Sequence, residues 1–211
     1  MTTTNLETPI FEFTGNHLCL DFANTLSNRT STPRERLNRY DDLVRWSREA
    51  GILAENDAQR LHAEATQRPE EAEQVLRQAI ELREAMYRIF SAHTSDTKAD
   101  ERDLAMLNSM FARAMTRACL HNNGKSFVLD WSWNREQEPV ALDRMLWSIA
   151  RSMAELLTSE ALEFVRMCAA DDCGWLFLDT SKNHSRRWCD MKSCGNRAKA
   201  RKYYKKVQTG E

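Results

Sequence analysis

Four of the six cysteines in this 211-residue chain stand in two pairs with the same internal spacing. Cys168 and Cys173 are separated by four residues, and Cys189 and Cys194 repeat that spacing after an interval of fifteen residues. Two cysteines a few residues apart can bend around one edge of a metal ion, and two such turns complete a tetrahedron of thiolates. Because zinc favours four soft or borderline ligands in a tetrahedron, the spacing predicts one Zn²⁺ bound by all four thiolates.

The predicted zinc site is structural, because four thiolates leave no coordination position open for the water that a catalytic site requires. A segment of this length would barely fold without metal, and zinc coordination contributes about 10–16 kcal/mol to the folding of such modules. Two disulfides or a chance cluster are the alternatives. The other two cysteines, Cys19 and Cys119, stand alone in apolar surroundings and are expected to be buried packing residues.

The start of the chain bears on the redox state of these cysteines. Its residues, MTTTNLETPIFEF, contain no charged start followed by an apolar stretch, so we expect no signal peptide and a cytoplasmic location. In the reducing cytosol, clustered cysteines bind metal more often than they form disulfides. The chain also lacks an uninterrupted apolar run of about 18 residues, so we expect neither a membrane-spanning helix nor a membrane partner.

The segment between the cysteine pairs has to bring them together, and we expect it to form a β-hairpin. Its apolar stretch 175–178 predicts one strand, 186–189 predicts the return strand, and 179–183 predicts the turn. Trp188 precedes a predicted ligand and is expected to pack against the metal site. His184 is expected on the surface or facing a phosphate, because four cysteines already complete the shell.

A basic amphipathic helix is predicted from Cys194 to about Val207. At about 100° per residue, its cationic side chains cover one wide face, and Ala200, Tyr203 and Tyr204 lie on the opposite face. From the first of the paired cysteines onward, ten Lys and Arg outnumber five Asp and Glu, although the whole chain has a net charge of −1. A cationic face of this kind is typical of contact with nucleic-acid phosphates. The predicted contact residues are Arg186, Arg187, Arg197, Lys199, Arg201, Lys202 and Lys205.

Within this helix, Arg197 lies in the first turn and is the best candidate for a base or phosphate contact. Asn196 is expected to form a local hydrogen bond that fixes the cysteine turn, in preference to contacting a base. The alternative for the basic face is a solvated helix, or one docked on acidic parts of the N-terminal domain. DNA is the favoured partner, with RNA or an acidic protein as alternatives. One finger alone should bind weakly, so a homodimer is expected.

The upstream residues predict a mainly helical domain of an α+β fold. After Pro69, apolar residues recur at three- and four-residue spacing as far as His93, which predicts a long amphipathic helix. Other helices are predicted from Asp41 to Gly51, over 55–67, after Asp100 and from Pro139 onward.

A few short antiparallel strands complete the predicted domain. A hairpin is predicted within 10–20 around Gly15-Asn16, followed by a short helix that Asp21 would cap. A second pair is predicted at 117–121 and 126–133, and a last strand is predicted over 163–167.

Three polar residues near the start are candidates for a small-ligand pocket. Asp21 and Asn24 lie three residues apart, hence on one helix face, and His17 would join them. We favour the alternative that Asp21 caps the helix and Asn24 braces a turn. The sequence contains no nucleophile elbow, phosphate loop, metalloprotease signature or Gly-rich dinucleotide motif, so we expect no enzymatic activity.

The assembled motifs resemble two known families. The tetrad Cys-Gly-Asn-Arg at 194–197, with the paired cysteines, resembles the CGNR zinc finger over 165–207. The segment 15–25, GNHLCLDFANT, is similar to the opening motif of the ABATE domain, which usually precedes this finger in bacteria. The resemblance implies a transcription regulator, with a DNA-binding finger over 163–211 and a domain over 1–162 that senses a ligand or mediates assembly.

Overall fold

The computed structural model describes residues 11–122, 124–131 and 140–209 of the chain. The described part is α+β as predicted, with seven α-helices and three two-stranded antiparallel sheets. The helices are α1 (Leu18–Ala23), α2 (Tyr40–Glu49), α3 (Glu55–Gln67), α4 (Pro69–Thr94), α5 (Glu101–Met115), α6 (Arg144–Leu157) and α7 (Asn196–Thr209). The strands are β1 (Leu26–Ser27), β2 (Arg34–Glu35), β3 (Cys119–Asn122), β4 (Phe127–Asp130), β5 (Val165–Met167) and β6 (Leu176–Leu178).

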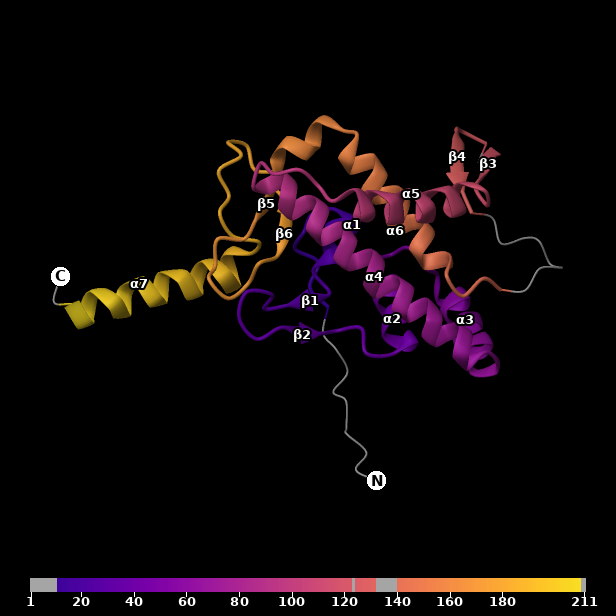
Figure 1. Ribbon diagram of the computed structural model, residues 1–211, viewed down its shortest axis with the longest axis horizontal. Coiled ribbons are helices and arrows are strands. Elements are labelled where there is room, and N and C mark those ends of the chain that lie inside the picture. Colours follow the sequence, from indigo (N-terminus) through magenta and orange to yellow (C-terminus); the bar gives the residue numbers. More distant parts are fainter. Residues whose placement is uncertain (1–10, 123, 132–139, 210–211) are drawn as a thin grey trace, which may run out of the picture.

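Helix α4 is the centre of the hydrophobic core, and α1 and α5 pack against it while α6 packs against both of them (Figure 1). Its predicted apolar stripe is buried, because residues at three- and four-residue spacing share one helix face. The buried stripe consists of Val75, Ala79, Leu82, Met86, Ile89 and Phe90. Helices α2, α3 and α5 also lie where the sequence predicts them, and Asp100 caps α5 by accepting a hydrogen bond from the Arg102 amide at 2.8 Å.

The predicted opening hairpin is wrong. Residues 11–17 form no strand, residue 10 lies outside the described part, and Leu18 already begins α1. The turn exists for a tertiary reason: the Gly15 amide donates to the Asp21 carboxylate at 2.7 Å, and the Gly15 carbonyl accepts from the Leu178 amide at 2.8 Å. Asp21 therefore lies inside α1 and binds the preceding loop, and His17 takes the N-cap position that we predicted for Asp21.

Helix α6 begins at Arg144, later than predicted, and Pro139 lies outside the described residues. The stretch just before α6 is held by the Tyr40 hydroxyl, which donates to the Leu142 carbonyl at 2.9 Å. The predicted pair of strands near 117–133 is present as β3 and β4, although 132–133 are not described.

The hairpin of the C-terminal part pairs different strands from those predicted. Strand β6 pairs with β5, and 186–189 forms no strand but contributes one backbone bond, from the Ala169 amide to the Arg187 carbonyl at 2.9 Å. The pairing follows burial, because Val165 of β5 and Leu176 of β6 lie in the same core cluster as α4. The N-terminal helices and this hairpin share a core, and the boundary between 162 and 163 stays a prediction.

Asn24 fixes β6 to the helical part. Its side-chain amide donates to the Leu176 carbonyl at 2.8 Å, and its side-chain oxygen accepts from the Leu176 amide at 3.0 Å. Helix α7, in contrast, extends away from the rest of the molecule (Figure 1). In the described part of the chain, no helix has both the length and the apolar character that spanning a membrane requires.

Candidate metal centre

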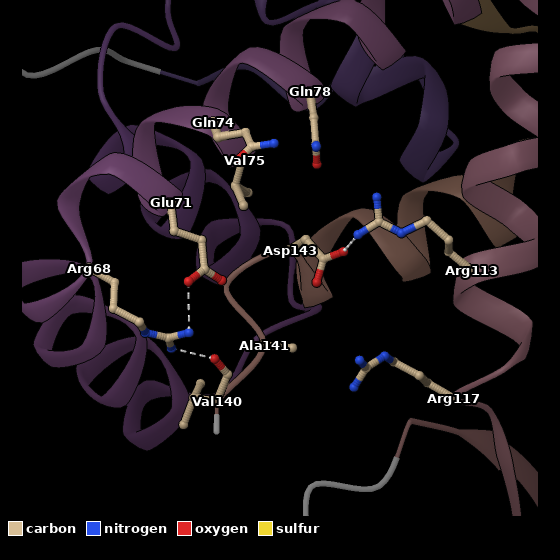
Figure 2. A pocket seen from close by; sticks show the side chains of 10 residues that line it. All are labelled: Arg68, Glu71, Gln74, Val75, Gln78, Arg113, Arg117, Val140, Ala141 and Asp143. Carbon is tan, nitrogen blue, oxygen red and sulfur yellow. Dashed lines mark hydrogen bonds and ion pairs between the residues drawn. The ribbon is translucent and has the colours of Figure 1, made fainter. Parts of the chain in front are cut away.

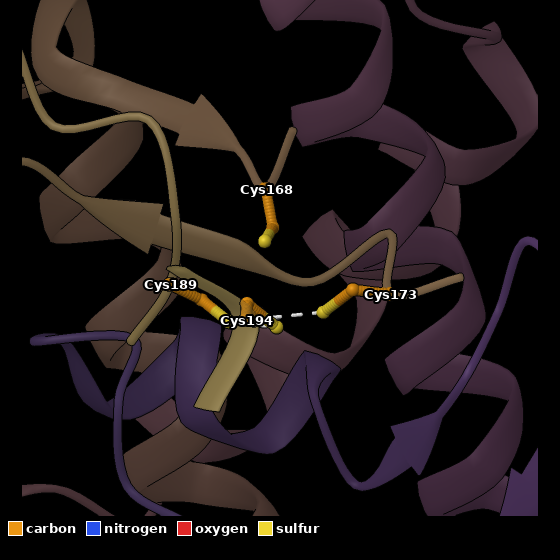
Figure 3. Close-up of side chains that lie close together, drawn as sticks. All are labelled: Cys168, Cys173, Cys189 and Cys194. Atoms are coloured by element: carbon orange, nitrogen blue, oxygen red, sulfur yellow. Dashed lines mark hydrogen bonds between the residues drawn. The ribbon is translucent and has the colours of Figure 1, made fainter. Parts of the chain in front are cut away.

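The sulfur atoms of the four paired cysteines converge on one point (Figure 3). All four lie within 4.8 Å of one another, and the side chains are buried. The Sγ atoms of Cys173 and Cys189 are 3.7 Å apart, and those of Cys189 and Cys194 are 3.6 Å apart. A tetrahedron with Zn–S bonds of roughly 2.3 Å has edges of roughly 3.8 Å, so the cluster has the dimensions of a four-thiolate zinc site. All six cysteines are free, which excludes the two-disulfide alternative.

Two tight turns place these sulfurs. In the first, the Cys168 amide donates to the Trp175 carbonyl at 2.7 Å, and Gly174 has a φ of +68°, which favours glycine. In the second, the Asp190 carboxylate accepts from the Ser193 amide at 2.7 Å. Gly195 ends this turn, and a β-carbon there would lie 2.4 Å from the Met191 sulfur. A side chain at the glycine of the tetrad would therefore require the exposed Met191 side chain to move.

The cluster needs a cation to ionise fully. Hydrogen bonds from Cys173 and Cys189 to the Cys168 sulfur lower the pKa of Cys168. The same interactions, together with burial, raise the pKa of Cys173 and of Cys189, because neighbouring thiolates repel one another. A bound divalent ion removes this repulsion and lets all four sulfurs act as ligands.

Arg197, the predicted base or phosphate contact, lies against this cluster. Its guanidinium donates to the Cys194 sulfur at 3.2 Å and lies 3.4 Å from the Asp172 carboxylate. A Zn²⁺ with four thiolates carries about two negative charges in excess, and a guanidinium at this distance offsets part of them. Asn196 forms the predicted local hydrogen bond, from its side-chain amide to the Lys192 carbonyl at 3.0 Å. Trp188 packs against the cysteine cluster, as predicted.

Two protein-family models match this chain. The family model of ABATE, described as "Putative stress-induced transcription regulator", matches residues 16–160. The chain belongs to the ABATE family. A second model, the CGNR zinc finger, matches residues 165–206 and covers all four clustered cysteines, so the cluster is the structural Zn²⁺ site of a CGNR finger. Both matches are to regulator and zinc-finger types and neither is to an enzyme family. No curated protein matches the chain.

The predicted nucleic-acid residues of this ABATE protein fall into different environments. Lys199 and Lys202 are exposed on α7, and Arg187 is exposed on the loop before Cys189. Arg201 is half exposed and pairs with Asp172 at 2.7 Å. The side chain of Lys205 lies outside the described part of the structure.

Arg186 faces inward instead of joining this surface. Its guanidinium lies over the Phe177 ring at 4.6 Å, donates to the Trp188 carbonyl at 2.8 Å and also donates to the Cys189 carbonyl. The Arg186 amide donates to the Asp179 carboxylate at 2.8 Å. These bonds hold the loop that leads to the third ligand cysteine, so we assign Arg186 a structural role. His184 is exposed and stacks on Phe164.

The candidate pocket residues do not converge on one cavity. The His17 ring lies 3.2 Å from both the Cys19 sulfur and the Ser152 hydroxyl, whereas Asp21 and Asn24 bind backbone groups. Asp21 and Asn24 line a cavity of about 10 Å³, which His17 does not reach and which is no larger than one water molecule needs. Cys19 is fully buried, as predicted, whereas Cys119 is only partly buried, so the prediction was wrong for Cys119.

Asp21 should make the stability of the folded protein depend on pH. Burial raises the pKa of Asp21 from 3.8 to about 6, against the lowering effect of the Gly15 amide. The folded state therefore holds this proton more tightly than the unfolded state, so stability falls as pH rises from about 4 to 6. An amide keeps the acceptor without the charge, so we expect Asp21→Asn to raise the free energy of unfolding at pH 7 by about 2–3 kcal/mol.

Urea unfolding at pH 5 and pH 7 checks this expectation. The gain from Asp21→Asn should be larger at pH 7, and the exposed control Glu73→Gln should change stability equally at both pH values. A gain for Asp21→Asn that is the same at both pH values would contradict a raised pKa.

A larger cavity, which we did not predict, lies between α4, α5 and the stretch before α6. It has a volume of about 460 Å³ and is lined by charged and amide side chains (Figure 2). Arg113 pairs with Asp143 at 2.5 Å, and Arg68 pairs with Glu71 at 3.0 Å. These charges come from three separate segments, so no single motif could have marked the cavity. It is distinct from the site that we predicted around His17.

Proposed function

We propose that this protein is a transcription regulator that binds duplex DNA through α7 of its zinc finger. The observation that carries the proposal is the exposure of α7: every side chain described from Lys199 to Gln208 is exposed. Residues 196–209 contain six Lys and Arg and no Asp or Glu. The helix is about 21 Å long, and the diameter of an α-helix matches the width of a major groove.

The alternative in which α7 docks on acidic parts of the N-terminal domain has less support. The first turns of α7 contact Cys194, Asp171 and Asp172. The rest of α7 lies away from the other helices (Figure 1). Phosphate contacts made by lysines release counterions, and that supplies most of the affinity of a single small module. One such helix binds weakly, so we propose that two copies act together on two half-sites.

The N-terminal domain would then sense a ligand or hold the two copies together. The 460 Å³ cavity beside α4 has the size of a small-molecule site, and we propose it as the ligand site in place of the residues around His17. Binding of the finger to RNA or to an acidic protein is the alternative function.

Salt dependence tests DNA binding directly. We expect the logarithm of the association constant for duplex DNA to fall with the logarithm of salt concentration at a slope steeper than about −2. The double variant Lys199→Ala/Lys202→Ala removes two exposed cations and should flatten that slope by about 1.8. Fluorescence anisotropy with a labelled duplex at several salt concentrations measures both slopes.

The control removes two lysines that lie outside the zinc finger, Lys98→Ala/Lys125→Ala, and should leave the slope unchanged. An unchanged slope in the α7 variant would exclude this helix as the contact surface. A higher affinity for structured RNA than for duplex DNA at equal salt would favour the alternative function.

A further inference from the structure

The first cysteine turn, residues 168–174, is called here the first zinc turn. Its four consecutive backbone carbonyls from 171 to 174 accept hydrogen bonds from the N-terminal domain. The donors are the Thr30 hydroxyl to Asp171 (2.7 Å), the Ser31 hydroxyl to Asp172 (3.4 Å), the Arg29 amide to Cys173 (3.1 Å) and the Tyr87 hydroxyl to Gly174 (2.8 Å). Neither Thr30 nor Tyr87 belongs to the finger. The backbone of the first zinc turn is therefore positioned by the N-terminal domain as well as by the metal.

The element that holds this turn is itself fixed. The Arg29 guanidinium binds both carboxylate oxygens of Glu84, at 2.8 and 3.1 Å, and donates to the Ala23 carbonyl at 2.9 Å. It also lies over the Tyr87 ring at 3.8 Å. A bidentate, stacked and largely buried guanidinium has little freedom, so the contacts to the zinc turn are pre-organised.

The side chains of the same turn point at the cationic helix. The Asp172 carboxylate lies 2.7 Å from Arg201 and 3.4 Å from Arg197. Asp171 is more distant, at 3.7 Å from Arg201, and its side chain is 91% exposed. Two of the cations expected to meet phosphate are therefore already engaged by a carboxylate whose backbone the N-terminal domain fixes.

We propose that Asp172 is an intramolecular competitor for phosphate on the first turns of α7. This inference rests on the proposed function and assigns to Asp172 the control of how that surface takes an anion. A carboxylate and a phosphate offer a guanidinium the same kind of oxygen acceptors, so they compete for Arg197 and Arg201. The Arg201 side chain is 50% exposed and that of Asp172 27% exposed, and ion pairs at such exposure are weak enough to exchange.

The competitor makes α7 selective for dense arrays of phosphate. An isolated anion gains too little binding free energy at Arg201 to displace the Asp172 carboxylate. This carboxylate belongs to the same chain and therefore acts at a high effective concentration. A duplex also contacts Lys199 and Lys202, which form no ion pair with a carboxylate of the described residues, and these extra contacts favour displacement of Asp172. Because the Asp172 backbone is bonded to Ser31, a shift of the N-terminal domain would change the strength of the competition.

Asp172→Asn in the zinc-loaded full chain tests the proposal. Freeing one guanidinium for phosphate should steepen the salt slope for duplex DNA by about 0.9 and raise affinity roughly tenfold at 0.1 M salt. Asp171→Asn is the matched control, since it makes the same change of charge one residue away and should raise affinity less than about twofold. Zinc content should equal one ion per chain in both variants. Equal or weaker binding by Asp172→Asn, or equal gains in the two variants, would overturn the proposal.

A second measurement separates this inference from the proposed function. Immobilised heparin is a polyanion without bases, and Asp172→Asn should elute from it at higher salt than wild type and Asp171→Asn. If no form binds duplex DNA but this order of elution holds, the proposed function fails and the competitor stands. If all forms bind DNA and elute together from heparin, the competitor fails and the function stands. Failure of every form to bind heparin would overturn both.

Discussion

Removing zinc from the reduced protein should unfold α7 and the second cysteine turn, while the helices α1 to α6 keep their structure. The apolar cluster around the sulfurs is small, with Ala170, Trp175, Phe177 and Trp188 packed on the four cysteines. Metal coordination worth about 10–16 kcal/mol therefore dominates the stability of this part. The side chains that the structure describes from Lys199 to Gln208 are all exposed, and an isolated helix of this length is marginal in water.

Cys189→Ser tests this expectation without a chelator. We expect the variant to bind zinc far more weakly and to lose far-UV circular dichroism equivalent to α7. Hydrogen exchange should show loss of protection from Arg186 to Thr209 and continued protection in α4. Strand β6 should stay partly protected, because Asn24 and the main core hold it independently of the metal.

Cys119→Ser is the matched control, since Cys119 lies on β3 outside the cysteine cluster. It should retain one zinc per chain by elemental analysis, together with the wild-type spectrum. Wild-type protein, purified under reducing conditions, that holds no stoichiometric metal would contradict the assignment. Retention of α7 in Cys189→Ser would also contradict the argument, because it would mean that another contact supports the helix.

The parts of the fold that the sequence predicts are those with local causes. The two cysteine pairs lie within single turns, and α4 carries its own apolar stripe from Val75 to Phe90. Asp100 caps α5 from the adjacent residue, so the start of that helix follows from local chemistry. The presence of these helices and of the zinc site could therefore be predicted without knowing which distant residues they contact.

The parts that were wrong depend on contacts between distant segments. Gly15-Asn16 is typical of a hairpin turn, but its geometry is set by Asp21 and by the Leu178 carbonyl and amide, far along the chain. The partner of β6 was also misassigned, since alternating residues indicate a strand without saying which strand it meets. Arg186 has the composition of a phosphate contact, and only the fold shows that Phe177 and the Cys189 carbonyl occupy its guanidinium.

The contacts that join the N-terminal domain to the zinc finger could not be predicted from the sequence either. Arg29 and Glu84 are 55 positions apart, and neither belongs to a motif that indicates an ion pair. Their contact, and that of Tyr87 with Gly174, depends on how α4 crosses the loop before β2. Coupling of this kind requires the folded arrangement, because charge pairs at long range have no spacing rule.

Arg83 is the buried centre of this charge network and is only 2% exposed. Its guanidinium binds both oxygens of Glu35, at 2.6 and 2.8 Å, and donates to Glu84 at 2.8 Å. Burial opposes the charge of Arg83, but these carboxylates outweigh it and raise its pKa. Each charge in the network is stabilised by the others, so losing one should cost more than an average contact.

Arg83→Met should lower the free energy of unfolding of the zinc-loaded protein by about 3–5 kcal/mol, because it leaves Glu35 and Glu84 without their shared cation. Urea unfolding measures the change. Arg77→Met is the control on the same helix, since the Arg77–Glu73 pair is exposed and should contribute less than about 0.5 kcal/mol. Adding Glu35→Gln to Arg83→Met removes the stranded charge and should recover part of the loss. A loss below about 1 kcal/mol, or no recovery in the double variant, would show that packing of the arginine stem, and not its charge, holds this region together.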